Sequence, residues 1–128
     1  NSNYLDWGVR NFELNRIPHQ KHLFERADCL RWLRGSRGRF DRILLNPPSY
    51  SRSKSMAGDF DVTRDYPALI QDAASRLAAG GVLYFVTHAR GFKLDPAQLP
   101  GLVVKDIHES TIPRDFERSP HHAFRISR

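Results

Sequence analysis

Apolar positions recur along the chain at two spacings, one typical of helices and one typical of buried strands. Over residues 4–15 and again over residues 66–77, apolar side chains return every three or four positions. This spacing places them along one face of a helix, so it predicts two amphipathic helices. We expect Asp65 to cap the second helix and Gly80-Gly81 to end it, because these residue types favour helix starts and helix ends.

Elsewhere the apolar residues form short runs that predict strands. The predicted strands cover residues 22–27, 40–45, 82–87, 102–109 and 123–127. A short helix is expected to follow Asp28, which is placed to cap it. Helices that alternate with buried strands are typical of α/β proteins with a mainly parallel sheet covered on both faces. We therefore expect one α/β domain over residues 1–128, without an internal boundary.

The composition narrows the class of protein. The chain has 128 residues, 40% of them hydrophobic, and one cysteine. No apolar run reaches the roughly 18 residues that a membrane-spanning helix needs, so no membrane partner is expected. The first residues show no signal-peptide pattern. A single cysteine excludes a disulfide framework and a zinc site built on cysteines.

The positive charge is concentrated in one stretch. The chain carries 20 Lys and Arg against 14 Asp and Glu, a net charge of +6. The stretch from Arg31 to Lys54 holds seven basic residues and one acid, Asp41. A cluster of this kind favours a polyanionic partner such as a nucleic acid, because phosphate contacts release counterions. A solvated surface rich in arginine is the alternative interpretation.

Polar groups follow the predicted strands, and ligands of open α/β sheets bind at the carboxyl ends of strands. The sharpest motif is the run of residues 46–50, Asn46-Pro47-Pro48-Ser49-Tyr50. The two prolines fix the backbone direction after the strand, so the Asn46 amide can face a base and Tyr50 can stack on one. The alternative interpretation is a proline-rich turn that only ends a strand.

Other candidate residues have two interpretations each. Asp28 either caps the helix after it or accepts a hydrogen bond from a cofactor's amino group. Cys29 has no base nearby in the sequence, and a lone cysteine is more often a small buried hydrophobe than a nucleophile. The adjacent His121 and His122 point apart on a strand, so no metal site is expected.

Several motifs together resemble a known family. They are Asp28-Cys29-Leu30, Asn46-Pro47-Pro48-Ser49-Tyr50-Ser51-Arg52-Ser53-Lys54, Phe60-Asp61-Val62-Thr63-Arg64-Asp65, Arg90-Gly91-Phe92 and Asp115-Phe116. This set resembles the methyltransferase domain of the 23S rRNA guanine methyltransferases, which use S-adenosyl-L-methionine (SAM). The resemblance is greatest to the C-terminal half of the bifunctional bacterial enzyme, the half assigned N7 methylation of a guanine.

The resemblance implies a fold, a cofactor and a set of site residues. The fold is a Rossmann-like class I methyltransferase fold, with a mostly parallel sheet and an antiparallel last strand. SAM would be the cofactor and 23S rRNA the partner, which implies a cytoplasmic protein. By the same resemblance Asp28, Cys29 and Asn46 would bind SAM, and Asn46, Pro47 and Pro48 would form the catalytic segment. The resemblance places Ser49, Tyr50 and Lys54 in the substrate loop. Arg90 and Phe92 of the Arg90-Gly91-Phe92 motif are further candidate substrate-binding residues, and Arg90 either holds a phosphate or is ordinary surface charge.

The sequence departs from the family pattern in two ways. Family members often have Asp where this chain has Asn46, and Asn followed by two prolines is more familiar from amino-group methyltransferases, so N6 of adenine or N2 of guanine stays an alternative target. The glycine-rich turn and the ribose-binding acid of a SAM site are not found. We therefore expect the C-terminal part of a methyltransferase domain that lacks the first two strands.

Such a part would bind SAM poorly and be inactive alone, and it would form a homodimer by pairing its exposed edges or by swapping elements with another copy. The competing hypothesis is a non-catalytic, basic RNA-binding module on a degenerate methyltransferase scaffold.

Overall fold

The computed structural model describes residues 2–35, 37–52, 58–116 and 121–128. The chain divides into two compact units, Asn1–Trp32 and Leu33–Arg128, and each is described by itself. Lys54, a predicted substrate-binding residue, lies outside the described residues.

The first unit contains the predicted N-terminal helix. Helix α1 spans Ser2–Leu14, and a short 3-10 helix, η1, spans His19–Lys21. The ring of Phe12 stacks on His22 with a centroid distance of 4.9 Å and meets Phe24 edge-on at 5.1 Å. The amphipathic helix expected over residues 4–15 is therefore confirmed.

The strand predicted over residues 22–27 is wrong. These residues belong to no helix or strand, and Leu23 is 83% exposed. A strand is stable only when a neighbouring strand takes up its N–H and C=O groups. Among its described residues the first unit offers no such neighbour, so the apolar run remains an irregular segment.

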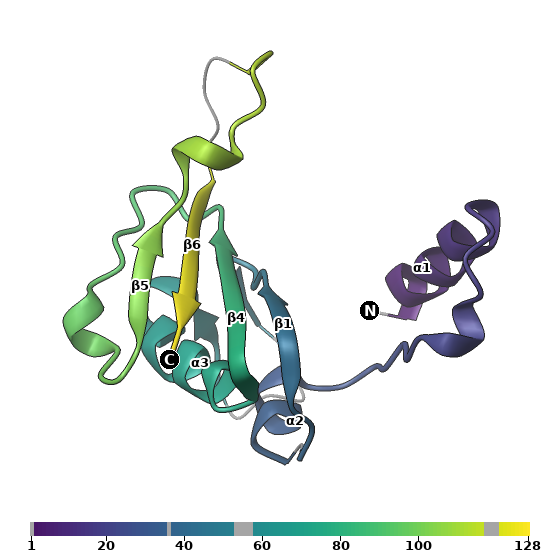
Figure 1. The fold of residues 1–128 in the computed structure, drawn as a ribbon, viewed down its shortest axis with the longest axis horizontal. Helices are drawn as coiled ribbons and strands as arrows, with labels where there is room; N and C mark the ends of the chain where they lie inside the picture. Colours follow the sequence, from purple (N-terminus) through teal and green to yellow (C-terminus); the bar gives the residue numbers. More distant parts are fainter. Residues whose placement is uncertain (1, 36, 53–57, 117–120) are drawn as a thin grey trace. The chain divides into compact units, whose positions relative to one another are not determined.

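The second unit is built on a four-stranded sheet with the order β1-β4-β6-β5 (Figure 1). The strands are β1 (Phe40–Leu45), β4 (Leu77–Thr87), β6 (His122–Ser127) and β5 (Val103–Asp106). β1 is parallel to β4, whereas β6 is antiparallel to both β4 and β5. Three strands therefore run one way and the last runs against them, as the expected fold class requires.

One face of this sheet carries the core. Leu83 pairs with Ile126 and Phe85 pairs with Phe124, so these side chains share a face, and all four are buried. Helix α3 (Val62–Ala74) contributes a buried apolar face of its own to this core. The opposite face of the sheet carries exposed side chains within this unit, among them Leu44, Val103 and Arg125. Covering of both faces was predicted, and the second unit covers only one.

The boundaries of α3 differ from the predicted ones. Asp61, not Asp65, is its N-cap, because Asp61 Oδ1 accepts a hydrogen bond from Thr63 N at 2.8 Å. Asp65 instead accepts from Asp61 N at 2.9 Å, which closes the first turn from the other side. The helix ends at Ala74, and Gly80-Gly81 lies inside β4.

The remaining elements are short. Helix α2 spans Cys29–Gly35 after Asp28, as expected. Between β1 and α3, β2 (Tyr50–Ser51) and β3 (Phe60–Asp61) form a short antiparallel pair. Two 3-10 helices follow, η2 (Pro96–Gln98) and η3 (Glu109–Thr111). Within the described ranges, the helices are too short or too polar to cross a bilayer.

Candidate functional site

The predicted catalytic segment lies at the carboxyl edge of the sheet. Asn46 comes directly after β1, and His88 comes directly after β4. The two strands are parallel and Leu45 is in register with Phe85, so both following loops leave from the same edge. This edge is where open α/β sheets bind their ligands.

The Asn46-Pro47-Pro48 segment presents its polar group to solvent. Asn46 and Pro48 are exposed and Pro47 is half-buried. The segment is held at its far end, because Val62 N donates a hydrogen bond to the Ser49 carbonyl at 3.0 Å. Ser49 is exposed and the Tyr50 side chain is 49% exposed. The amide of Asn46 and the ring of Tyr50 are therefore both accessible to a base.

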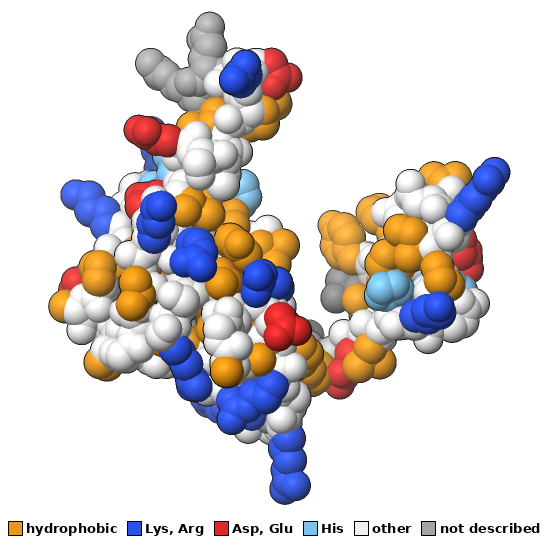
Figure 2. Space-filling model, viewed as in Figure 1, with side chains coloured by type: hydrophobic (Ala, Val, Ile, Leu, Met, Phe, Trp, Pro, Cys, Tyr) orange, Lys and Arg blue, Asp and Glu red, His pale blue; other side chains and the backbone are white. Residues whose placement is uncertain are grey.

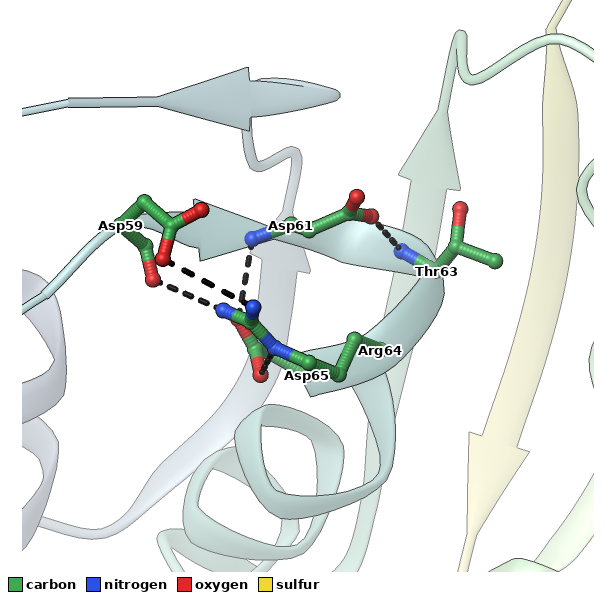
Figure 3. A network of polar contacts seen from close by, with 5 residues as sticks. All are labelled: Asp59, Asp61, Thr63, Arg64 and Asp65. Carbon is green, nitrogen blue, oxygen red and sulfur yellow. Dashed lines mark hydrogen bonds and ion pairs between the residues drawn. The ribbon is translucent and has the colours of Figure 1, made fainter.

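A polar network holds the β3–α3 junction behind this segment (Figure 3). The Arg64 guanidinium donates to Asp65 Oδ1 and to the Asp59 carbonyl, each at 2.8 Å. Asp65 and Asp61 close the network through the two backbone bonds of the helix start. The hydrogen bond from Arg64 lowers the pKa of Asp65 below its usual value, and the same bond raises the pKa of Arg64. The network fixes the strand pair that carries Tyr50.

The sequence pattern singled out Asp65 as a helix cap, and Asp61, Thr63 and Arg64 entered only through the family resemblance, without an assigned contact. The available signal was the spacing of Asp61 and Asp65, since an acid at a helix start and another one turn later can cap the helix reciprocally. A proline is tolerated in the first turn of a helix, and a helix capped by Asp65 would have one there. The sequence pattern therefore favoured Asp65 as the cap.

The segment after β4 lies at the same carboxyl edge of the sheet as the segment after β1. Thr87 is fully buried and its Oγ1 accepts a hydrogen bond from Ala89 N at 3.2 Å. Gly91 has a φ of 70°, which turns the chain back so that Phe92 N reaches the Ala89 carbonyl at 3.2 Å. Arg90 projects from this turn and is exposed, so it is accessible to a phosphate.

Phe92 lies in the core and not on the surface. It is 3% exposed and packs against Tyr66 and Phe85 at centroid distances of 5.2 and 5.8 Å. A ring in that position holds the turn of Arg90 in place and is not open to stack on a base. Its predicted part in substrate binding is therefore restricted to positioning.

Four histidines gather at the same edge, and no role was predicted for them as a group. The His108 ring lies 5.0 Å from His121 and 6.2 Å from His122, and His88 lies 6.3 Å from His121. Partial burial, and then the neighbouring imidazoles, lower the pKa of His121. Thr111 Oγ1 lies 2.6 Å from His121 Nε2. Across the described part of the chain, no three histidine, cysteine or acidic side chains stand in a metal-binding arrangement.

Asp28 belongs to the first unit, and both of its interpretations are compatible with its contacts. Its Oδ1 accepts from Leu30 N and Arg31 N at 3.1 Å, which confirms the N-cap. Both hydrogen bonds of this cap go to one carboxylate oxygen, and the second oxygen of a carboxylate can accept an amino group such as that of adenine. Cys29 is exposed, so the expectation of a buried cysteine is wrong.

The fold defines the class of architecture. A mostly parallel α/β sheet of three parallel strands and one reversed strand, with polar groups at its carboxyl edge, matches a Rossmann-like methyltransferase fold. The crystal structure of SMU.776, a candidate methyltransferase complexed with SAH, superposes with a TM-score of 0.64 at 20% sequence identity. The match covers 92% of this chain and 34% of that one.

Sequence comparison identifies the particular relatives. The chain is homologous to a segment of the ribosomal RNA large subunit methyltransferases K/L. It is 44% identical to the protein of that name from Methylococcus capsulatus, over 96% of this chain, and 45% identical to that from Dichelobacter nodosus, over 91%. The chain spans 17% and 16% of those two relatives, about one sixth of their length. No family model matches the chain.

Proposed function

We propose that this chain forms part of a SAM-dependent methyltransferase that modifies a guanine of 23S rRNA. The observation that carries the proposal is the exposed Asn46 amide at the carboxyl end of β1, next to the parallel strand β4. The relatives named for large-subunit rRNA methylation support the same assignment. An rRNA substrate also implies a cytoplasmic location.

The proposal gives a role to most of the candidate residues. Asn46 orients the target base through its amide, and the two prolines hold that amide in position. Tyr50 stacks on the base, which must leave its own stack to enter the site. Arg90 holds a phosphate beside the base. Asp28 accepts the adenine amino group of SAM, and Cys29 lies in the same cofactor-binding segment.

N7 of guanine is the proposed target atom. Bound SAM would supply an electrophilic methyl group, and the N7 lone pair, which carries no proton, would accept it as the sulfonium–methyl bond breaks and the thioether leaves. A site that aligns its reactants without a strong general base is sufficient for this reaction. An exocyclic amino group, the alternative target, has to lose a proton after it is methylated.

The test grafts this chain into the Methylococcus capsulatus relative, in place of the segment that it matches. Methyl transfer to a 23S rRNA transcript is measured with labelled SAM, and mass spectrometry with chemical cleavage at 7-methylguanine identifies the atom. We expect the graft to be active and Asn46→Ala to lower the rate about 100-fold, because the base is no longer oriented. Asn11→Ala, at an exposed position on α1, is the matched control.

Three outcomes separate the hypotheses. An unchanged rate in Asn46→Ala contradicts the proposed site. Methylation at N2 or N6 shows that the target atom is an exocyclic amino nitrogen and not N7. An inactive graft that binds RNA but gives no heat with SAM in calorimetry favours the non-catalytic RNA-binding module. Among the described strands, β1 and β5 are the edges of the sheet, and pairing of copies through these edges remains a prediction.

A further inference from the structure

A basic cleft lies at the amino edge of the sheet, opposite the Asn46 edge. It has a volume of about 640 Å³ and is formed by the first residues of β4, 77–82, together with Arg39, Arg125, Ser127 and Arg128. This volume is in the range of ligand-binding pockets, roughly 300–1,000 Å³. Figure 2 shows Lys and Arg side chains gathered over the end of the sheet where β1 and β4 begin.

The cleft concentrates positive charge without acidic partners. Arg39, Arg125 and Arg128 are exposed, and none of the lining residues is an Asp or Glu. The Arg39 guanidinium donates to the Ser75 carbonyl, which fixes it at the rim. Arg125 is in register with Lys105 on β5, so a fourth positive charge shares its face of the sheet. Like charges held together repel one another, and a bound polyanion relieves this repulsion.

The chemistry of the cleft indicates which anion it binds. A guanidinium presents a planar fork of donors that matches phosphate oxygens, and several arginines in a row follow successive phosphates. All three arginines are exposed, so the cleft can admit a continuous chain as well as a small ion. We propose that this cleft binds the phosphodiester backbone of the RNA substrate at a second contact, remote from the target base. The identity of the polyanion as RNA rests on the proposed function.

The two edges have different tasks in this arrangement. The paired part of β4 from Val82 to Thr87 separates them by roughly 17–20 Å, at about 3.3 Å per residue. The target base enters at the Asn46 edge, whereas the cleft contacts only backbone and reads no sequence. The cleft therefore contributes affinity and leaves the choice of base to the other edge.

The test measures binding of a fluorescent single-stranded RNA to this chain by anisotropy, without SAM, over a series of salt concentrations. The variant carries Arg39→Gln, Arg125→Gln and Arg128→Gln. We expect weaker binding and a slope of log K against log salt that is smaller by roughly 2. The slope falls because binding with fewer phosphate contacts releases fewer counterions. The double variant Arg125→Gln and Arg128→Gln keeps the Arg39–Ser75 contact, and its slope is expected to be smaller by somewhat more than 1.

A matched control has the same change in net charge. Arg10→Gln, Arg26→Gln and Arg114→Gln remove three exposed arginines outside the cleft. If this control lowers the slope as much as the cleft variant does, binding is diffuse and the proposal is overturned. If uridine monophosphate competes as well as the RNA at equal phosphate concentration, the cleft is a small-anion site and the proposal is also overturned.

The result is independent of the methylation assay. Asn46→Ala is expected to leave the salt slope unchanged, because that residue contacts the base and not the phosphates. A grafted enzyme that methylates RNA while the cleft variant binds normally overturns the cleft alone. If the graft transfers no methyl group but the cleft variant still loses RNA binding, the proposed function is overturned and the cleft is not.

Discussion

Asp61 joins the β2–β3 pair to the start of α3, and its carboxylate caps the helix. It accepts a hydrogen bond from Thr63 N, and its own N–H donates to Asp65. Asp61→Ala removes the cap, so we expect the free energy of unfolding to fall by about 1 kcal/mol, within the 0.5–2 kcal/mol measured for such caps. Urea denaturation measures the change. Asp61→Asn keeps the acceptor and is expected to lose less, and an equal loss in both variants would show that the charge matters more than the cap.

At the scale of elements, Tyr66 connects α3 to the segment that carries Arg90. The Tyr66 side chain is 3% exposed, and its hydroxyl accepts a hydrogen bond from Asp95 N at 3.0 Å. Tyr66→Phe keeps the packing against Phe92 but leaves the Asp95 N–H without its acceptor. We expect a loss of about 1–3 kcal/mol in the free energy of unfolding, the cost of an unsatisfied donor.

Hydrogen exchange locates this effect. The amide of Asp95 is expected to exchange faster in Tyr66→Phe than in the original protein, while the amides of β1 keep their relative protection. Uniform acceleration over the whole second unit would contradict a local connection and indicate a general loss of stability.

Elements were predictable from sequence where local signals and packing agree. The stripe of α1, the cap at Asp28 and the strand β1 follow from spacing and residue type, and the structure has all three. The strand over residues 22–27 failed because pairing is a property of two segments, and one apolar run cannot supply its own partner. The cap of α3 failed because both Asp61 and Asp65 suit a helix start, and only the β2–β3 pair decides between them.

The candidate site was predictable in part for the same reason. Parallel strands bring their carboxyl ends to one edge, so the association of Asn46 with the segment after β4 follows from the fold class. The burial of Phe92 and the gathering of four histidines do not follow, because both depend on how β5 and β6 fold back over the end of β4.

At the scale of the whole molecule, His121 links stability to pH. Partial burial lowers the pKa of His121 below its ordinary value of 6.5, and the neighbouring imidazoles of His108, His88 and His122 lower it further. As pH falls through 6.5, the unfolded chain binds a proton that the folded chain does not, so stability falls until the lower folded pKa is reached. We expect the urea midpoint to be lower at pH 5.5 than at pH 7.5.

A variant tests whether His121 carries this dependence. His121→Asn removes the titrating group, so its urea midpoint is expected to change less between the two pH values than that of the original protein. A midpoint that rises on acidification, or a variant with the same pH dependence, would rule out this assignment.

The position of β6 has a consequence for how the protein is made. β6 lies between β4 and β5 but follows both in the sequence, and β4 and β5 do not pair with each other. A ribosome releases residues in order, so β5 emerges with no strand to join until residues 122–127 are also outside the exit tunnel. Until that moment Val103–Asp106 has no neighbour in the sheet, and a chaperone or a pause in translation at this stage would act on an unattached strand.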